Sequence, residues 1–160
     1  MAEHRITTLD NSSINRFKGF LSGVQLILKR RQYDVALEAF LFQLNDADVT
    51  DEDVIAAAYS DGYNPILHHE LVPLDTVIAE VNSFLTLARD IWNQGPLIDV
   101  IEGELRDGYW NHLKPCIDYR SAQIVSVGPH VPYMNIMKGF TYILYADRSR
   151  ALLLVGNISD

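Results

Sequence analysis

The spacing of apolar residues predicts helices through the first two thirds of the chain. Apolar side chains recur at helical spacing behind residues 10–13, whose polar side chains are of the types that cap helix N-termini. A second helix is predicted over 33–44, where most positions are apolar, and a third begins at Thr50–Asp53, which resembles a capping box. Two more are predicted over 74–92 and from Pro96 to about Gly108. The pattern indicates about five helices before residue 114.

The pattern changes after Lys114. Four later segments are rich in Val, Ile, Tyr and Leu and are bounded by turn residues: 121–127, 133–137, 140–145 and 151–155. The residues Asp147 to Arg150 suit a hairpin turn between the last two segments. This order predicts an α+β fold in which N-terminal helices pack on a C-terminal antiparallel sheet of three to four strands. Because no linker separates the halves, we expect one domain over 1–160, mainly helical over 1–114 and mainly β over 115–160.

Composition is that of an ordinary globular protein, with 48% hydrophobic and 21% charged residues among 160. The lone cysteine, Cys116, cannot form a disulfide within the chain, which favours a reducing compartment. The N-terminal residues do not form a signal peptide, and no apolar run reaches the roughly 18 residues that a membrane span needs. We therefore expect a soluble cytoplasmic protein that does not bind membranes.

Charge is the feature that suggests a function. No Lys or Arg occurs between Arg31 and Arg89, and that interval holds eleven carboxylates. The densest part comprises five of them: Asp46, Asp48, Asp51, Glu52 and Asp53. Carboxylates gathered in this way attract basic surfaces and steer association. We therefore predict a non-enzymatic, inhibitor- or immunity-like binding module that docks this acidic surface on a basic protein partner, which can be a nucleic-acid-handling protein. The net charge of −8 opposes direct binding to nucleic acid. A solvated acidic face neutralised by the basic first helix is the alternative.

Metal and enzyme motifs are incomplete. The segment from Asp46 begins like a calcium loop but has Asp51 and Ala57 where that loop needs Gly and Glu, so we predict no metal site. The alternative function is a small enzyme, such as a hydrolase, that uses His68 or His69 with nearby carboxylates. Adjacent histidines point in different directions and rarely share one metal.

A nucleophilic cysteine is a further candidate. Cys116 has His112, His130 and Asp118 near it in the sequence, but no cysteine-hydrolase signature surrounds it. No glycine-rich phosphate cradle is present, so we predict no cofactor and assign no catalytic residues. A self-associating assembly subunit, or homo-oligomer, is the third possibility, because the last segments carry several aromatic residues: Tyr133, Phe140, Tyr142 and Tyr145.

Overall fold

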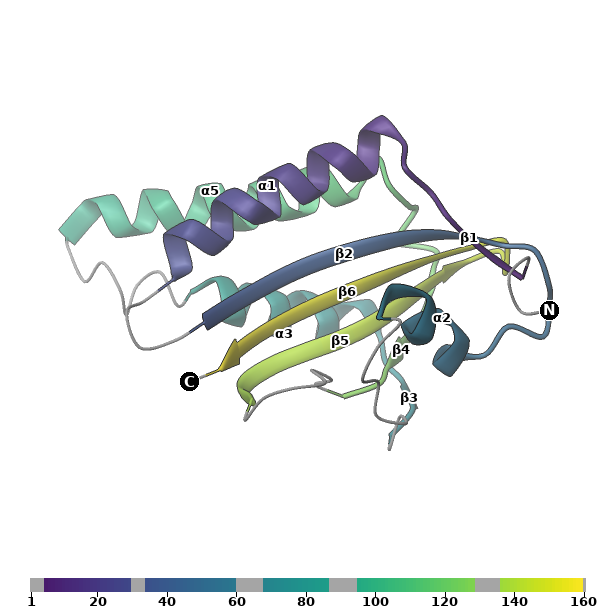
Figure 1. The fold of residues 1–160 in the computed structure, drawn as a ribbon. Coiled ribbons are helices and arrows are strands. Elements are labelled where there is room, and N and C mark those ends of the chain that lie inside the picture. The colour runs from purple at the N-terminus through teal and green to yellow at the C-terminus, as the bar shows by residue number, and fades with distance from the viewer. Residues whose placement is uncertain (1–4, 30–33, 60–67, 87–94, 129–135, 160) are drawn as a thin grey trace.

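A six-stranded antiparallel sheet organises the molecule (Figure 1). The computed structural model of the chain describes residues 5–29, 34–59, 68–86, 95–128 and 136–159. The elements follow in chain order: β1 (Ile6–Thr8), α1 (Ser12–Leu28), β2 (Asp34–Leu44), α2 (Asp51–Ala58), β3 (Glu70–Leu71), α3 (Leu74–Leu85), α5 (Gly95–Leu113), β4 (Gln123–Ser126), β5 (Ile136–Ala146) and β6 (Arg150–Ser159). In the sheet the strands lie in the order β1-β2-β6-β5-β4-β3, with every neighbouring pair antiparallel.

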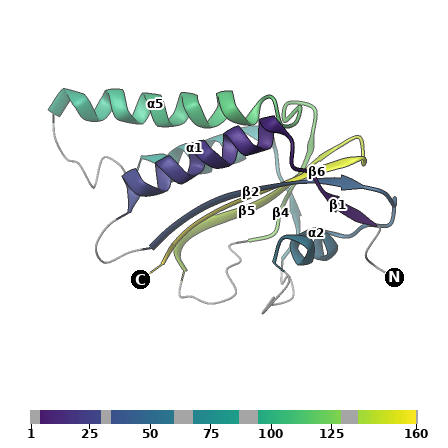
Figure 2. The ribbon, with the colours of Figure 1, turned by 45° about the horizontal axis from the view of Figure 1, so that its top comes forward.

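Helices cover the two faces of the sheet unequally. The helices α1, α3 and α5 lie on one face, and α1 runs beside α5 (Figures 1 and 2). The opposite face carries α2, whose Val54 and Ile55 pack against Phe42, Leu153 and their neighbours. Alternate residues of each strand enter the two cores, as the twofold repeat of a strand requires: Leu152 and Leu154 face the large helical layer, and Leu153 faces α2. Two separate apolar cores therefore hold the sheet between its helices.

The fold differs from the expected one in the number of its elements. We predicted about five helices on a sheet of three to four strands; the described residues form four helices and six strands. The α+β class is correct, but the sheet is not confined to the C-terminal part of the chain, because β1, β2 and β3 come from the first half. The strands β1 and β3 are three and two residues long. Strands this short show no period in sequence and form only by pairing with distant segments.

The predicted helix over 33–44 is wrong, since Asp34–Leu44 forms β2. β2 pairs with β6 over ten residues and has helices on both faces, so both sets of alternating side chains are apolar. A strand buried on both faces loses the apolar–polar alternation that distinguishes a strand from a buried helix. Leu37 and Leu41 enter the core under α1, whereas Phe42 and Leu44 enter the core under α2.

Several local predictions are confirmed. Thr50 caps α2, and its side chain and that of Asp53 form both hydrogen bonds of a capping box. The hairpin between β5 and β6 turns through Asp147 and Arg148, which both adopt positive φ, as tight turns between antiparallel strands require. The segments 133–137 and 140–145 were predicted as separate strands, but Ile136–Ala146 forms the single strand β5, and residues 133–135 lie outside the described residues. Within the described part of the chain, no helix is both long and apolar enough to cross a bilayer.

Gly156 in β6 provides a stability test of the core. A Cβ atom at this position would lie 2.4 Å from the Phe140 ring, which is 2% exposed and packs edge-to-face on Phe84. We expect Gly156→Ala to lower the free energy of unfolding by about 1–3 kcal/mol, because the buried ring must shift to make room for the Cβ. Gly103→Ala is the matched control: no neighbour lies within 4 Å of its added Cβ. It should stabilise α5 by about 0.5–1 kcal/mol. Urea unfolding measures both, and equal effects would contradict this packing.

Candidate functional site

The five predicted carboxylates lie together at one end of the sheet. Asp46 and Asp48 belong to the connection that follows β2, and Asp51, Glu52 and Asp53 form the first turn of α2. We call these five residues the acidic cluster. Three consecutive acids at the start of a helix are stabilised by the partial positive charge of its N-terminal N–H groups. The capping box fixes the helix start, so the cluster stands on a defined turn.

Arg5, just before β1, holds the two ends of the cluster together. Its guanidinium contacts the carboxylate of Asp46 at 3.0 Å and that of Asp53 at 3.4 Å. Asp46 also accepts the backbone N–H of Asp48 at 2.9 Å. This bond and the charge of Arg5 hold the pKa of Asp46 below its ordinary value. Among the described residues, no cation of α1 forms an ion pair with the cluster, so the first helix does not neutralise it through direct contact.

His69, at the opposite edge of the sheet, bridges two further carboxylates of the cluster. Its Nδ1 lies 2.8 Å from the carboxylate of Asp51, and its Nε2 lies 2.9 Å from that of Glu52. The bond to Asp51 raises the pKa of His69 despite some desolvation, and Glu52 adds to the effect. Both ring nitrogens can donate to the two carboxylates only when the ring is protonated, so this geometry favours the imidazolium form. The first turn of α2 is thereby tied to the segment that enters β3.

Asp51 has a second partner inside the fold. The hydroxyl of Tyr145, in β5, donates a hydrogen bond to the Asp51 carboxylate. Burial raises the pKa of Tyr145, and the bond to Asp51 raises it further. The exposed fraction of the side chain is 20% for Asp51 and 46% for Glu52. Asp51 therefore anchors α2 to the sheet, whereas Glu52 faces solvent.

A hollow of about 480 Å³ opens beside α2. Its polar lining comes from α2, the β3 side and the β5–β6 hairpin, and includes Asp51, Glu52, His69, Tyr145 and Arg148. Arg148 forms no ion pair with the described residues of the acidic cluster.

The cluster keeps a net negative charge after its ion pairs are counted. Five carboxylates less the charge of Arg5 leave −4, and a protonated His69 reduces this to −3. Its ion pairs are at least partly exposed to solvent, where salt bridges contribute little energy and partner charges remain accessible to other ions. The arrangement is a preorganised, solvent-facing anionic surface.

His69 is not a free base, whereas His68 has a partner among the described residues on one ring nitrogen alone. His68 lies 3.4 Å from Glu70 at an exposed position, and both nitrogens of His69 are already bonded to carboxylates. A general base needs an unoccupied nitrogen within reach of the substrate proton. The geometry of His69 therefore supports an electrostatic link more than proton transfer.

The cysteine group does not assemble into a nucleophile and base either. The Sγ–H of Cys116 donates to the backbone carbonyl of His112 at 3.4 Å, and burial raises the pKa of the thiol to about 11. The His112 ring stacks on Phe20 and is bonded to the Gly108 carbonyl. The carboxylate of Asp118 accepts the hydroxyl of Ser121, and His130 lies outside the described residues. In the described residues, no group of three or more His, Cys, Asp and Glu side chains is placed to hold a metal ion.

The two bonds between the His69 ring and the carboxylates of Asp51 and Glu52 predict a stability that depends on pH. The pKa of His69 in the folded state is raised above the ordinary value of 6.5. The stabilisation that protonated His69 contributes is therefore complete below pH 6.5 and is lost as the pH rises through the folded-state pKa. The stability difference between the wild type and His69→Asn should be larger at about pH 6 than at about pH 9. Urea midpoints at the two pH values measure it. His68→Asn is the control. A stability difference between the wild type and His69→Asn that does not change with pH would contradict the ionic bonding of His69 to Asp51 and Glu52.

Sequence comparison shows no family model and no curated protein that matches this chain. Comparison of structures finds similar folds. A crystal structure of citrus MAF1 in space group P 31 2 1 has a TM-score of 0.59 at 15% identity and covers 92% of this chain and 99% of that one. A second citrus MAF1 crystal structure, in space group C 2 2 21, has a TM-score of 0.57 at 13% identity, with 92% and 98% covered. At these identities the similarity shows the fold alone.

Proposed function

We propose that this protein is a non-enzymatic binding module that docks the acidic cluster on a basic surface of a protein partner. The observation that carries the proposal is that four of the five carboxylates are held in place by intramolecular bonds, while the group as a whole stays net negative. Preorganised charges lose little conformational freedom on binding, which favours affinity. Complementary charge also raises the association rate and selects among partners.

Among the cluster residues, some also support the fold and others do not. Asp51 bonds to Tyr145, and Asp53 completes the capping box, so changes there would disturb α2 itself. Asp48 is exposed. Asn at 46 can still accept the Asp48 N–H, and Gln at 52 can still bond to His69. The variant D46N/D48N/E52Q, here the patch variant, therefore removes three charges and retains these bonds.

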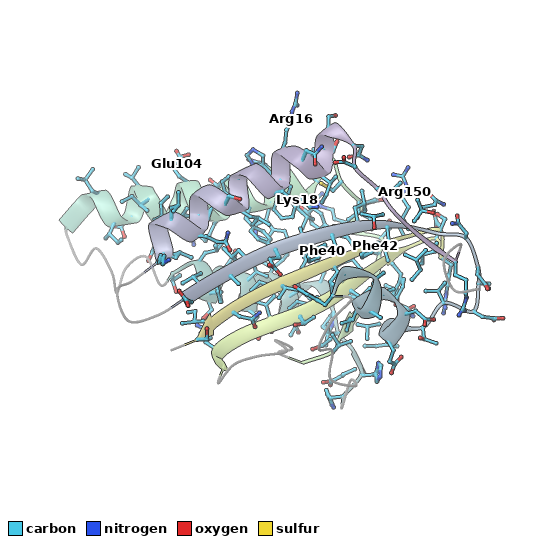
Figure 3. The ribbon with its side chains drawn as sticks, viewed as in Figure 1. Arg16, Lys18, Phe40, Phe42, Glu104 and Arg150 are labelled. Carbon is cyan, nitrogen blue, oxygen red and sulfur yellow. The ribbon has the colours of Figure 1, made fainter. Side chains whose placement is uncertain are left out.

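Capture from a lysate of the host organism tests the proposal. The matched control variant, D10N/E104Q/D107N, removes three exposed charges elsewhere, and Glu104 lies on the outer side of α5 (Figure 3). Immobilised wild type and control variant should retain the same basic protein, which salt should elute, and the patch variant should retain much less of it. Retention of that protein by the patch variant at wild-type level would refute docking through the acidic cluster.

A further inference from the structure

A second hollow, of about 470 Å³, lies at the same end of the sheet and is lined by residues 114–120 after α5 and by Arg150 at the start of β6. Alternate residues of a strand share a face. Leu152 packs in the core under α1, α3 and α5, so the side chain of Arg150 leaves the sheet toward the helical layer. Figure 3 shows Arg150 at the end of the sheet where the β5–β6 hairpin turns. We call this site the basic hollow.

The charges around the basic hollow are mostly positive and unpaired. Lys114, Arg120 and Arg150 line it, and none of them forms an ion pair with the described residues. The one acidic residue in the lining, Asp118, binds the Ser121 hydroxyl at 2.7 Å instead. Three cations less the carboxylate of Asp118 leave a formal charge of +2 around one depression, which is a local positive field in a chain with a net charge of −8.

The buried side chains in the lining of the basic hollow are apolar, and we call them its floor. It contains Cys116 and Tyr119, which are 2% and 9% exposed. The Tyr119 ring packs on Trp110 at a centroid distance of 5.4 Å, and the indole N–H of Trp110 donates to Asn82 at 3.0 Å. The thiol of Cys116 is neutral at physiological pH, because burial raises its pKa to about 11. The floor therefore adds no negative charge to oppose an anion.

We propose that the basic hollow binds a small organic phosphate monoester, with the phosphate among Lys114, Arg120 and Arg150 and the organic part against the floor. Guanidinium groups bind phosphate oxygens through paired N–H donors, and a lysine adds a point charge. The volume of about 470 Å³ is within the range of pockets that hold small molecules. The combination of cationic rim and apolar floor distinguishes this ligand class from inorganic phosphate, which would use the rim alone.

Titration with three probes tests this inference: phenyl phosphate, inorganic phosphate and phenol. Calorimetry should show saturable binding of phenyl phosphate, weaker binding of inorganic phosphate and none of phenol. When phenyl phosphate is added to the wild type, the amide NMR signals that shift should be those of residues 114–120. This measurement locates the site without the use of a variant. R120Q/R150Q should bind phenyl phosphate at least about tenfold more weakly. The loss of even one hydrogen bond to a charged group lowers affinity by roughly this factor. R16Q/R106Q removes two exposed positive charges, one on α1 and one on α5, and should bind as the wild type does. Figure 3 shows Arg16 on α1.

Three results would overturn the inference. No saturable binding of phenyl phosphate to the wild type, or shifts outside the hollow, would remove the site. Equal weakening in both double variants would show that general charge attraction, not the hollow, holds the anion. If inorganic phosphate binds as tightly as phenyl phosphate, the organic part is not recognised and the hollow holds an adventitious ion only. If R120Q/R150Q fails to give a folded-protein NMR spectrum, the single variants R120Q and R150Q take its place.

Discussion

Replacement of Phe17 by Ala should lower the free energy of unfolding by about 3–5 kcal/mol, the usual cost of removing a buried aromatic ring. Phe17, in α1, is fully buried and packs edge-to-face on Tyr109 of α5 at a centroid distance of 5.2 Å. It therefore joins two helices to each other and to the sheet beneath them. The loss includes the transfer of the ring to water and the cavity left between rigid neighbours.

Urea unfolding of Phe17→Ala measures this loss as a lower midpoint at an unchanged slope. Leu26→Ala is the control on the same helix, because the Leu26 side chain is 78% exposed. Its effect should stay within about 0.5 kcal/mol. A Phe17→Ala loss below about 1 kcal/mol would mean that the α1–α5 interface does not form as described.

Association with the captured partner should slow when the acidic cluster loses charge. Electrostatic steering raises association rates by about 10- to 10³-fold, so the patch variant D46N/D48N/E52Q should lose roughly tenfold or more at low salt. The dissociation rate should change less, because the three carboxylates replaced in the patch variant are exposed to solvent and act mainly on the encounter with the partner. Stopped-flow mixing or surface binding kinetics separates the two rates.

The control D10N/E104Q/D107N has the same total charge as the patch variant. It should associate at close to the wild-type rate, since steering depends on where the charge lies. Equal slowing in both variants would show that net charge alone sets the rate. Both variants need a wild-type melting temperature for the comparison to hold.

Local sequence signals predicted the parts of the fold that depend on neighbouring residues. Thr50 and Asp53 are three residues apart, and both hydrogen bonds of their capping box form. The turn at Asp147 and Arg148 likewise depends on local backbone preference. β2 was not predictable in this way, because its strand state follows from pairing with β6 more than 100 residues later. Its two apolar faces matched a buried helix equally well.

In the candidate site, too, the sequence predicted what lies close together along the chain but not the contacts between distant segments. The acidic cluster was visible in sequence because its five carboxylates fall within eight consecutive positions. Its partners were not, since Arg5 reaches Asp46 across 41 residues and Tyr145 reaches Asp51 across 94. His69 was named as a catalytic candidate, but its position between Asp51 and Glu52 depends on the packing of α2 beside β3. Lys114, Arg120 and Arg150 were not recognised as a group, because only the fold brings Arg150 to the end of α5.

The decisive experiment is the salt dependence of the association rate between the wild type and its captured partner. Salt screens exposed charges, with a Debye length of about 10 Å at 0.1 M and about 3 Å at 1 M. If the acidic cluster steers docking, the rate for the wild type falls steeply as salt rises, and the rate for the patch variant is low and nearly constant. A wild-type rate that does not change with salt, or parallel slopes for wild type and patch variant, would contradict docking through the acidic cluster.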